Sequence, residues 1–296
     1  MIDFSSRHDI WLEDDEGSLQ RMDEPYFRSW QIAPGTWQIL SDGDYSYLVE
    51  GDDEAIMIDS GYGAGSIREY AQSLTDKPVS RICNTHDHFD HTANNCYFEL
   101  AYMSAATRPL ATIPFPSFEG IDFPRDYPVE LVTDGDIIPL RGRELKVFEI
   151  PDHAVGSLVF LDERERILFS GDEFMAFGKS LHGSVAHWAA MLEKLLAVRD
   201  RFDRLCAGAW PDMNPAIIEQ QYACARHILD GYEGVPARPG RFPGEERIDA
   251  QGRRIWKRRI PHPGDGPKDI NRDIEYRREM RYAGTCIIYD IRHIRD

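Results

Sequence analysis

The sequence predicts a layered α/β protein, and three observations favour this fold class. The chain has 296 residues, of which 42% are hydrophobic and 11% aromatic, and this composition is enough to bury a large core. Short β-type runs alternate with helical segments, an order typical of sheets that are covered by helices. The alternation occurs twice along the chain. We therefore expect two similar halves, each made of a β-rich block followed by helical segments.

The first half begins with three short β-type runs that are separated by turns rich in glycine and aspartate. This pattern predicts an antiparallel meander. A helix, a further strand and a second helix are expected after the meander. The expected strands are residues 36–40, 45–50, 55–59 and 81–85, and the expected helices are residues 66–74 and 92–100.

Residues 113–128 separate the two halves. This segment contains four prolines and four aromatic residues, too many breakers for a regular helix or strand. We expect a long surface loop. Two interpretations of the loop stay open, a spacer and a lid over a substrate.

The second half combines a β-rich block with two amphipathic helices that flank a short strand. In the first of these helices the apolar residues Trp188, Leu192 and Leu195 recur at the spacing of one buried helix face. The expected strands are residues 129–132, 137–140, 144–150, 157–161, 166–169 and 204–207, and the expected helices are residues 186–201 and 216–229.

Residues 235–296 are predicted to form a basic C-terminal extension to a main domain of residues 1–234. The extension carries fifteen Lys and Arg against ten Asp and Glu, a net charge of +5, whereas the remaining residues carry −22. We expect a hairpin of residues 247–250 and 253–260, then a charged helix-like segment and a strand at 285–291. Apolar residues such as Trp256 and Ile287 indicate that the extension packs on the domain or on a partner subunit, so a homodimer is one expectation.

Charge, hydropathy and cysteine usage restrict the partners and the compartment. The net charge of −17 argues against nucleic acid or an anionic membrane as a partner. No run approaches the roughly 18 apolar residues of a membrane helix, and residues 1–16 are acidic where a signal peptide would be basic. The five cysteines are scattered and contain no C-x-x-C pair, so no disulfide framework is predicted. We expect a cytoplasmic protein.

Three histidines lie within six residues, in an H-x-H-x-D-H pattern formed by His86, His88, Asp90 and His91. The pattern follows an apolar strand and precedes a predicted helix, so we expect it on a strand-end loop where several side chains can converge. Imidazole nitrogens and carboxylate oxygens suit Zn²⁺, and also Fe²⁺ or Mn²⁺. The sequence therefore predicts a site for one or two ions of zinc, with iron or manganese as alternatives.

Two further strand ends carry side chains of the types that bind metals. His153 follows the expected strand at 144–150, and Asp172 follows the expected strand at 166–169. Layered α/β sheets place their active sites at such strand ends. We expect both residues to lie near the histidine cluster.

Together these motifs resemble those of the metallo-β-lactamase fold superfamily of metallo-hydrolases. The matching segments occur in the expected order: an Ile-Asp-Ser-Gly turn at residues 58–61, the H-x-H-x-D-H motif, an H-x-x-G-S motif that begins at His153, and a Ser-Gly-Asp motif that ends at Asp172. The resemblance covers residues from about 32 to 230. It implies a four-layer αβ/βα sandwich with two metal ions in the cleft between the sheets.

The resemblance also implies two sets of ligands that share one carboxylate. They are His86, His88 and His153 for the first ion, Asp90 and His91 for the second ion, and Asp172 as the bridge. Asp59 is implied to orient one of these ligands. Asp90 is the implied catalytic residue, since it ligates an ion or holds the attacking water and passes its proton to the leaving group.

One motif departs from the family pattern. Members usually complete the second site with a histidine in a Gly-His-x-Pro-like turn, but residues 207–211 read Ala-Gly-Ala-Trp-Pro here. Ala209, in the histidine position, cannot bind a metal, so we expect a weakened second site and reduced turnover. Three explanations stay open: natural loss of the second ion, an engineered inactive variant, or compensation by another residue. The candidates for compensation are Asp212, His182 and His187.

The resemblance implies a metal-dependent hydrolase that attacks an ester, lactone, thioester or amide bond of a small-molecule substrate. Two other classes of function stay open. One is a metal-bound but catalytically impaired binding or sensor protein. The other is a mononuclear iron oxidoreductase of the persulfide dioxygenase type, because those enzymes keep the H-x-H-x-D-H motif. His88 argues against flavodiiron oxidoreductases, which generally carry a glutamate at that place.

Overall fold

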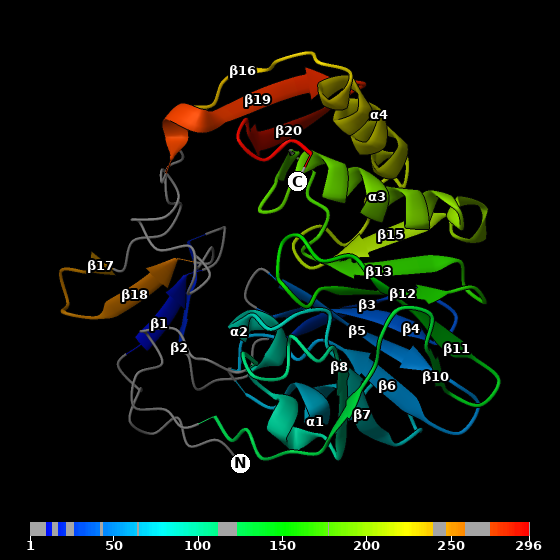
Figure 1. Cartoon of the computed structure of the whole chain (residues 1–296). Helices are drawn as coiled ribbons and strands as arrows, with labels where there is room; N and C mark the ends of the chain where they lie inside the picture. The colour runs from blue at the N-terminus through cyan, green and yellow to red at the C-terminus, as the bar shows by residue number, and fades with distance from the viewer. Residues whose placement is uncertain are drawn as a thin grey trace.

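The structure, a computed structural model, describes residues 10–13, 17–21, 27–41, 44–63, 65–111, 123–176, 178–238, 247–257 and 273–295. These residues form two large sheets and two small ones, and helices lie on the outer faces of the large sheets (Figure 1).

The first large sheet has seven strands in the order β3-β4-β5-β6-β7-β8-β9. Neighbouring strands are antiparallel from β3 to β6 and parallel from β6 to β9. The meander predicted from the sequence is confirmed. The strands are β3 (Arg28–Ala33), β4 (Thr36–Ser41), β5 (Asp44–Glu50), β6 (Ala55–Ile58), β7 (Val79–Cys83), β8 (Leu100–Met103) and β9 (Val129–Leu131).

The second large sheet has five strands in the order β10-β11-β12-β13-β15. Its neighbouring strands are antiparallel except for the parallel pair of β13 and β15. Every residue of β12 and β13 is buried, as expected of strands covered on both faces. The strands are β10 (Ile137–Pro139), β11 (Glu144–Glu149), β12 (Leu158–Asp162), β13 (Ile167–Gly171) and β15 (Arg204–Ala207).

Three apolar clusters produce a four-layer arrangement. One cluster lies between the two large sheets and includes Ile58 and Phe160. A second joins the first sheet to helix α1 (Ile67–Gln72). A third joins the second sheet to helices α3 (Val185–Leu196) and α4 (Ile217–Leu229). The predicted αβ/βα sandwich is therefore confirmed.

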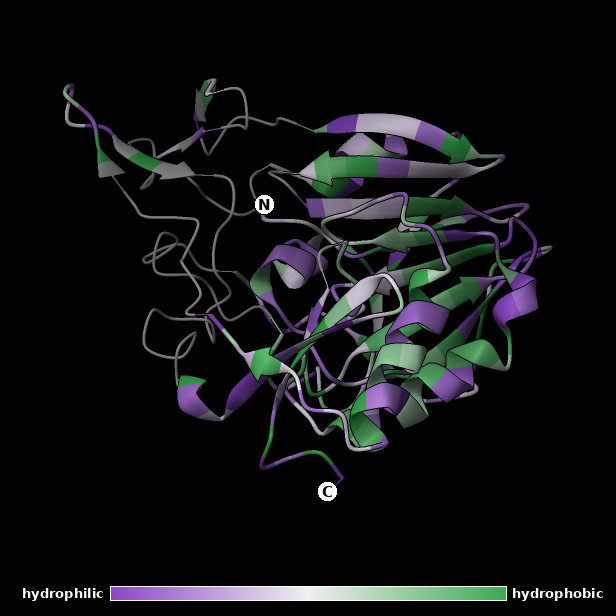
Figure 2. Ribbon diagram, turned by 90° about the horizontal axis from the view of Figure 1, so that it is seen from above, coloured by the Kyte–Doolittle hydropathy of each residue, from purple (hydrophilic) through white to green (hydrophobic). Residues whose placement is uncertain are grey.

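Local sequence signals explain where these helices begin and which face they bury. Ser66 caps α1 by accepting a hydrogen bond from the Glu69 N–H at 3.3 Å, and Ser184 caps α3 by accepting one from the His187 N–H at 3.0 Å. Such caps satisfy amide groups that have no partner within the helix. Hydrophilic and hydrophobic residues alternate along the helical ribbons in Figure 2. The helices thus cover the sheets with their apolar faces.

The C-terminal residues form parts of both small sheets. One has the order β14-β20-β19-β16, and its Met280 and Ile287 belong to the apolar cluster of α3 and α4. The other has the order β17-β18-β1-β2, and its antiparallel pair β17 and β18 corresponds to the predicted hairpin. Residues 258–260 of that prediction lie outside the described residues. The strands are β14 (Lys179–Ser180), β16 (Val235–Pro236), β19 (Arg277–Tyr282), β20 (Thr285–Asp290), β1 (Ile10–Glu13), β2 (Leu19–Arg21), β17 (Arg247–Ile248) and β18 (Arg254–Lys257).

Two predicted helices are wrong. Residues 92–100 contain only the end of the short helix α2 (Phe89–Thr92), a 3₁₀ turn (Asn95–Tyr97) and the first residue of β8. Asn94 accepts a hydrogen bond from the Ile67 N–H, and Asn95 exchanges two with Asn84, so these side chains bind other segments. The described part of the charged tail segment, from residue 273, forms a 3₁₀ turn (Ile274–Tyr276) and then β19, which pairs along its whole length with β20.

The loop predicted at residues 113–128 lies partly outside the described residues, which resume at residue 123. Residues 123–128 have no regular structure. Phe123 is nevertheless buried, and its ring centroid lies 4.9 Å from that of Phe89 in the H-x-H-x-D-H segment. The end of the loop thus packs beside the histidine cluster.

Among the described helices, none combines the length and apolar character that crossing a bilayer requires.

Candidate metal centre

The histidine-rich segment begins three residues after β7. His86 lies on the loop that follows this strand, His88 precedes α2, and Asp90 and His91 lie within α2. His86, Asp90 and His91 are buried. The segment therefore projects from one edge of the first sheet into the space between the sheets.

His153 and Asp172 approach the segment from the second sheet. His153 lies beyond the end of β11, and Asp172 directly follows β13. The carboxyl ends of β7, β11 and β13 thus meet at one end of the sandwich. The predicted convergence of side chains from distant strand ends is therefore confirmed.

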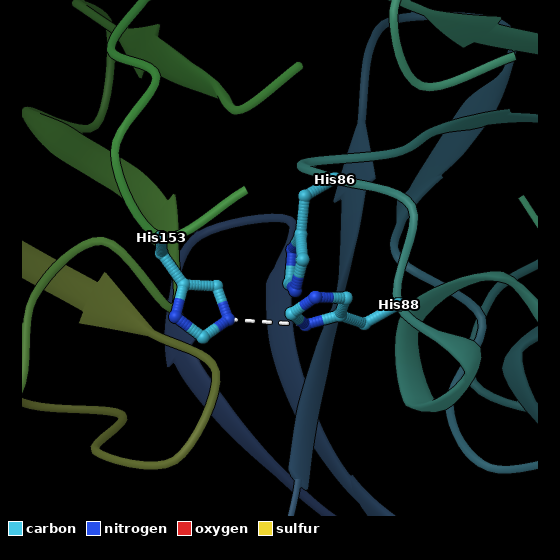
Figure 3. Close-up of side chains that lie close together, drawn as sticks. All are labelled: His86, His88 and His153. Atoms are coloured by element: carbon cyan, nitrogen blue, oxygen red, sulfur yellow. Dashed lines mark hydrogen bonds between the residues drawn. The ribbon is translucent and has the colours of Figure 1, made fainter. Parts of the chain in front are cut away.

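His86, His88 and His153 form one compact group (Figure 3). One nitrogen from each imidazole lies within 4.8 Å of the others. The Nε2 of His153 and the Nδ1 of His88 are 3.1 Å apart. Two nitrogens bound to one tetrahedral Zn²⁺ at about 2.0–2.1 Å are separated by about 3.3 Å. These three side chains therefore fit a single metal ion.

A second group lies beside the first and shares His86 with it. Its other members are His91 and Asp172, and the three potential ligand atoms again lie within 4.8 Å of one another. Asp172 faces both groups, since its carboxylate is 3.8 Å from His153 Nε2 and 3.7 Å from His91 Nε2. Asp90 completes this region, with an oxygen 3.6 Å from His91 Nε2. The six predicted residues thus lie together.

Burial and charge act differently on two of these histidines. Burial lowers the pKa of His86 well below its usual value, and the neighbouring histidines lower it further. Its imidazole is therefore neutral, the form that binds metals. Burial also opposes protonation of His91, but the carboxylates of Asp90, Asp59 and Asp172 outweigh it and raise the pKa of His91 well above the usual value. This end of the cleft thus favours positive charge.

Asp59 orients the histidine segment, as the resemblance implied. Its carboxylate accepts hydrogen bonds from the N–H and the hydroxyl of Thr85, both at 2.7 Å, and lies 2.8 Å from the Nδ1 of His91. This contact turns the Nε2 of His91 toward Asp90 and Asp172. Carboxylates that fix the ring of a metal-binding histidine in this way are common in metal sites.

The turn that contains Ala209 lies directly against the second group. A β-carbon added to Gly208 would lie 2.2 Å from an oxygen of Asp172 and 2.9 Å from a carbon of His91. None of the three compensating residues considered above joins a metal-binding group in the described part of the chain. Asp212 pairs with Arg204 at 3.4 Å and is 77% exposed.

Sequence reasoning missed two features of this region. Asp44, at the amino end of β5, forms a third potential metal-binding group with Asp90 and His91. The buried amine of Lys179 lies 3.0 Å from Asp152 and 2.6 Å from Glu173, the residues next to His153 and Asp172. One signal for Asp44 was available, because β5 is antiparallel to β6 and its amino end therefore lies at the edge that carries Asp59.

An open pocket of about 440 Å³ adjoins the three-histidine group. This volume is typical of sites for small molecules. His182 and His187 line the pocket, and their rings contact the backbone carbonyls of Asp152, His153 and Pro151. The complete lining is Asp87, His88, Leu110, Pro151, Asp152, His153, Ala154, Val155, His182, Gly183 and His187.

Comparison with known families decides the classification. A family model described as the metallo-beta-lactamase superfamily matches residues 42–209, more than half of the chain. The chain belongs to the metallo-beta-lactamase superfamily. The match ends at Ala209, so it includes all six predicted ligands and the position that lacks a histidine.

Similar proteins agree with this assignment. Acyl-coenzyme A thioesterase MBLAC2 of Homo sapiens is 28% identical over 192 residues, which cover 52% of this chain and 68% of that protein. Thioesterase pkgB of Emericella nidulans is 27% identical over 201 residues, which cover 66% of this chain but only 52% of that protein. Together with the family match, these named hydrolases confirm the prediction of a hydrolase.

A solved structure supports the fold. The metallo-beta-lactamase from Pontibacter korlensis superimposes with a TM-score of 0.54 at 16% sequence identity, and the match covers 68% of this chain and 99% of that one. At this level of identity the likeness concerns the fold alone. The sandwich of this superfamily member is therefore supported by its sequence motifs, by its topology and by a solved relative.

Proposed function

We propose that this superfamily member is a metal-dependent hydrolase that cleaves the thioester bond of a small acyl compound. The observation that carries the proposal is the pocket of about 440 Å³, whose wall includes both His88 and His153. A substrate in this pocket lies beside the group of side chains that fits a metal ion. Two relatives are named as thioesterases, and this favours a thioester among the bond types named above.

The residues fit zinc, with iron and manganese as alternatives. Three imidazoles with one adjacent carboxylate form a donor set suited to these ions. When bound, a divalent cation lowers the pKa of a coordinated water toward about 7 and polarises the carbonyl of the substrate. His86, His88 and His153 hold the first ion in this proposal, with Asp172 between the two groups. Asp90 and His91 belong to the second site.

The surrounding residues orient the substrate and move a proton. The buried carboxylate of Asp90 accepts a proton from the attacking water and returns it to the departing thiolate. Leu110 and Val155 are exposed apolar residues in the pocket wall, and they offer contact to an acyl chain. His182 and His187 add polar side chains to the wall of the same pocket.

A panel of matched substrates tests the proposal. The protein is loaded with Zn²⁺ and given acyl thioesters, the corresponding oxygen esters and a lactone, and the released thiol or acid is measured. We expect turnover of the thioesters to exceed that of the oxygen esters, and we expect His88→Ala to abolish it. The control is His227→Ala, because His227 stacks between Tyr232 and Tyr282 far along the chain from the motifs. Thioester turnover no faster than that of Zn²⁺ in buffer would overturn the proposal.

A parallel measurement separates the oxidoreductase alternative. The protein is loaded with Fe²⁺ under nitrogen and then mixed with a thiol persulfide and oxygen. Because we propose hydrolysis as the native reaction, we expect no oxygen uptake above that of free Fe²⁺. Stoichiometric oxygen uptake would assign the same site to persulfide oxidation.

A further inference from the structure

The second metal-binding region has a potential ligand that the family motifs do not supply. Asp44 is the first residue of β5, opposite Ser41 at the end of β4. One oxygen of Asp44, one oxygen of Asp90 and one nitrogen of His91 all lie within 4.8 Å of one another. Asp90 and His91 are the two residues that the resemblance assigned to the second ion.

Two hydrogen bonds from β5 hold Asp44 beside the turn that lacks the histidine. The N–H of Tyr45 donates a hydrogen bond to the carbonyl of Gly208 at 2.7 Å. Two residues further along β5, the hydroxyl of Tyr47 donates one to the carbonyl of Ala207, also at 2.7 Å. The start of β5 is therefore joined to residues 207 and 208. Asp44 thus lies beside the turn of Ala209, where the second metal-binding region lacks a histidine ligand.

His91 is oriented toward the same space. Its Nδ1 contacts Asp59 at 2.8 Å, so its Nε2 is the atom that remains for a metal. This Nε2 is buried and has no hydrogen-bond partner in the part of the chain that the structure describes. Its neighbours are carboxylate oxygens of Asp90 at 3.6 Å and Asp172 at 3.7 Å. A cation among these three groups would contact one nitrogen and two carboxylates.

We propose that Asp44 is a ligand of the second metal ion and replaces the histidine that is absent at position 209. The complete second site then consists of Asp44, Asp90 and His91, with Asp172 shared with the first ion. This inference rests on the proposed function, because it assumes that the first group binds a metal. With Asp44 as a ligand, the absence of a histidine at position 209 no longer predicts a weakened second site.

The composition of this site determines which ion it prefers. The first group offers three imidazoles, whereas the second would offer three carboxylates and a single imidazole. Carboxylate oxygens favour harder cations such as Mn²⁺, and imidazole nitrogens favour Zn²⁺. The two sites are therefore expected to differ in selectivity, with Zn²⁺ in the first and a higher relative preference for Mn²⁺ in the second. A second site with an added histidine would lose part of this preference.

Metal stoichiometry tests the inference without an activity assay. Purified protein is stripped with a chelator, dialysed against Zn²⁺ and then titrated with Mn²⁺, and bound ions are counted by mass spectrometry and by Mn²⁺ electron paramagnetic resonance. We expect two ions per wild-type chain and one per Asp44→Ala chain. Asp44→Asn keeps the shape of the side chain but loses its charge, and it is expected to weaken the second ion at least tenfold. Asp53→Ala, which removes an exposed aspartate of the next turn, is the matched control and keeps two ions.

A rescue experiment completes the test. The double variant Asp44→Ala/Ala209→His supplies a histidine from the neighbouring turn, and we expect it to bind two ions again with reduced preference for Mn²⁺. The ion that Asp44→Ala retains in the first site shows that this variant is folded. Two tightly bound ions in Asp44→Ala, or only one in the wild type, would overturn the role of Asp44 while leaving the proposed function intact. No metal in the wild type would overturn the proposed function itself.

Discussion

Replacement of Lys179 tests how the fold holds its two metal-binding loops in place. Lys179 is almost fully buried on β14, and its Nζ lies 3.0 Å from Asp152 and 2.6 Å from Glu173. Glu173 also accepts hydrogen bonds from the N–H groups of Asp152 at 3.1 Å and His153 at 2.8 Å. A single amine therefore balances two carboxylates next to His153 and Asp172. Lys179→Met keeps an unbranched apolar side chain and removes the charge.

The expected cost follows from the burial of this network. Breaking a buried ion pair by removing one partner costs about 3–5 kcal/mol, since the remaining charge is left without compensation. Lys179→Met leaves two buried carboxylates without a positive partner, so we expect a loss of at least about 3 kcal/mol in the free energy of unfolding. The matched control is Arg141→Met, whose partner Asp53 lies at 2.6 Å but whose side chain is 75% exposed. Exposed pairs contribute about 0–1 kcal/mol.

Urea unfolding of the metal-free proteins, followed by tryptophan fluorescence, provides the measurement. Chelator is present throughout, so that loss of metal binding does not add to the effect. Equal losses in the free energy of unfolding for Lys179→Met and Arg141→Met would show that burial does not strengthen the ion pairs of Lys179. Metal titration of the same variant gives a second readout, because displaced loops weaken binding to the first site.

Three further predictions follow from the same structure. His153→Ala removes one of three imidazoles and is expected to lower the affinity for the first Zn²⁺ by more than a hundredfold, whereas His227→Ala keeps wild-type affinity in the same competition titration. Asp59→Asn is expected to weaken metal binding by about 10–100-fold with little change in far-ultraviolet circular dichroism; unchanged affinity would show that it does not orient His91. Burial disfavours the charged form of Lys179, but its carboxylate partners raise its pKa above the usual 10.5. The stabilisation by the charged amine is therefore fully present below the pKa of this lysine in the unfolded chain, about 10.4. It declines as the pH rises through the pKa in the folded protein. The difference in the free energy of unfolding between the wild type and Lys179→Met should therefore stay constant between pH 7 and 10 and become smaller above pH 10. A difference that becomes smaller already below pH 9 would contradict the raised pKa of Lys179.

The sequence predicts those parts of the fold that depend on local patterns. Turn-forming glycine and aspartate residues mark where the strands end. Hydrophobic periodicity predicts the helix face that contains Trp188. His86, His153 and Asp172 can be identified from the sequence because each follows an apolar strand. Their convergence is also predictable, because layered sheets bring carboxyl ends of strands to one edge.

Tertiary contacts determine the features that sequence reasoning missed. The segment after His91 has helical spacing, but Asn94 and Asn95 bind residues that are distant in sequence, and the helix ends early. Asp44 is an ordinary turn residue until the pairing of β5 places it beside His91. Lys179 likewise resembles a surface lysine, and only the pairing of β14 with β20 buries it between two carboxylates.

Reconstitution of metal-free protein shows whether hydrolysis depends on a metal held by the converging histidines and aspartates. Chelated protein is assayed for thioester hydrolysis while Zn²⁺ is added in steps, with bound zinc measured in the same samples. We predict that the rate falls to background after chelation and returns in proportion to bound zinc. A full hydrolysis rate in samples that contain no metal would rule out metal-dependent hydrolysis.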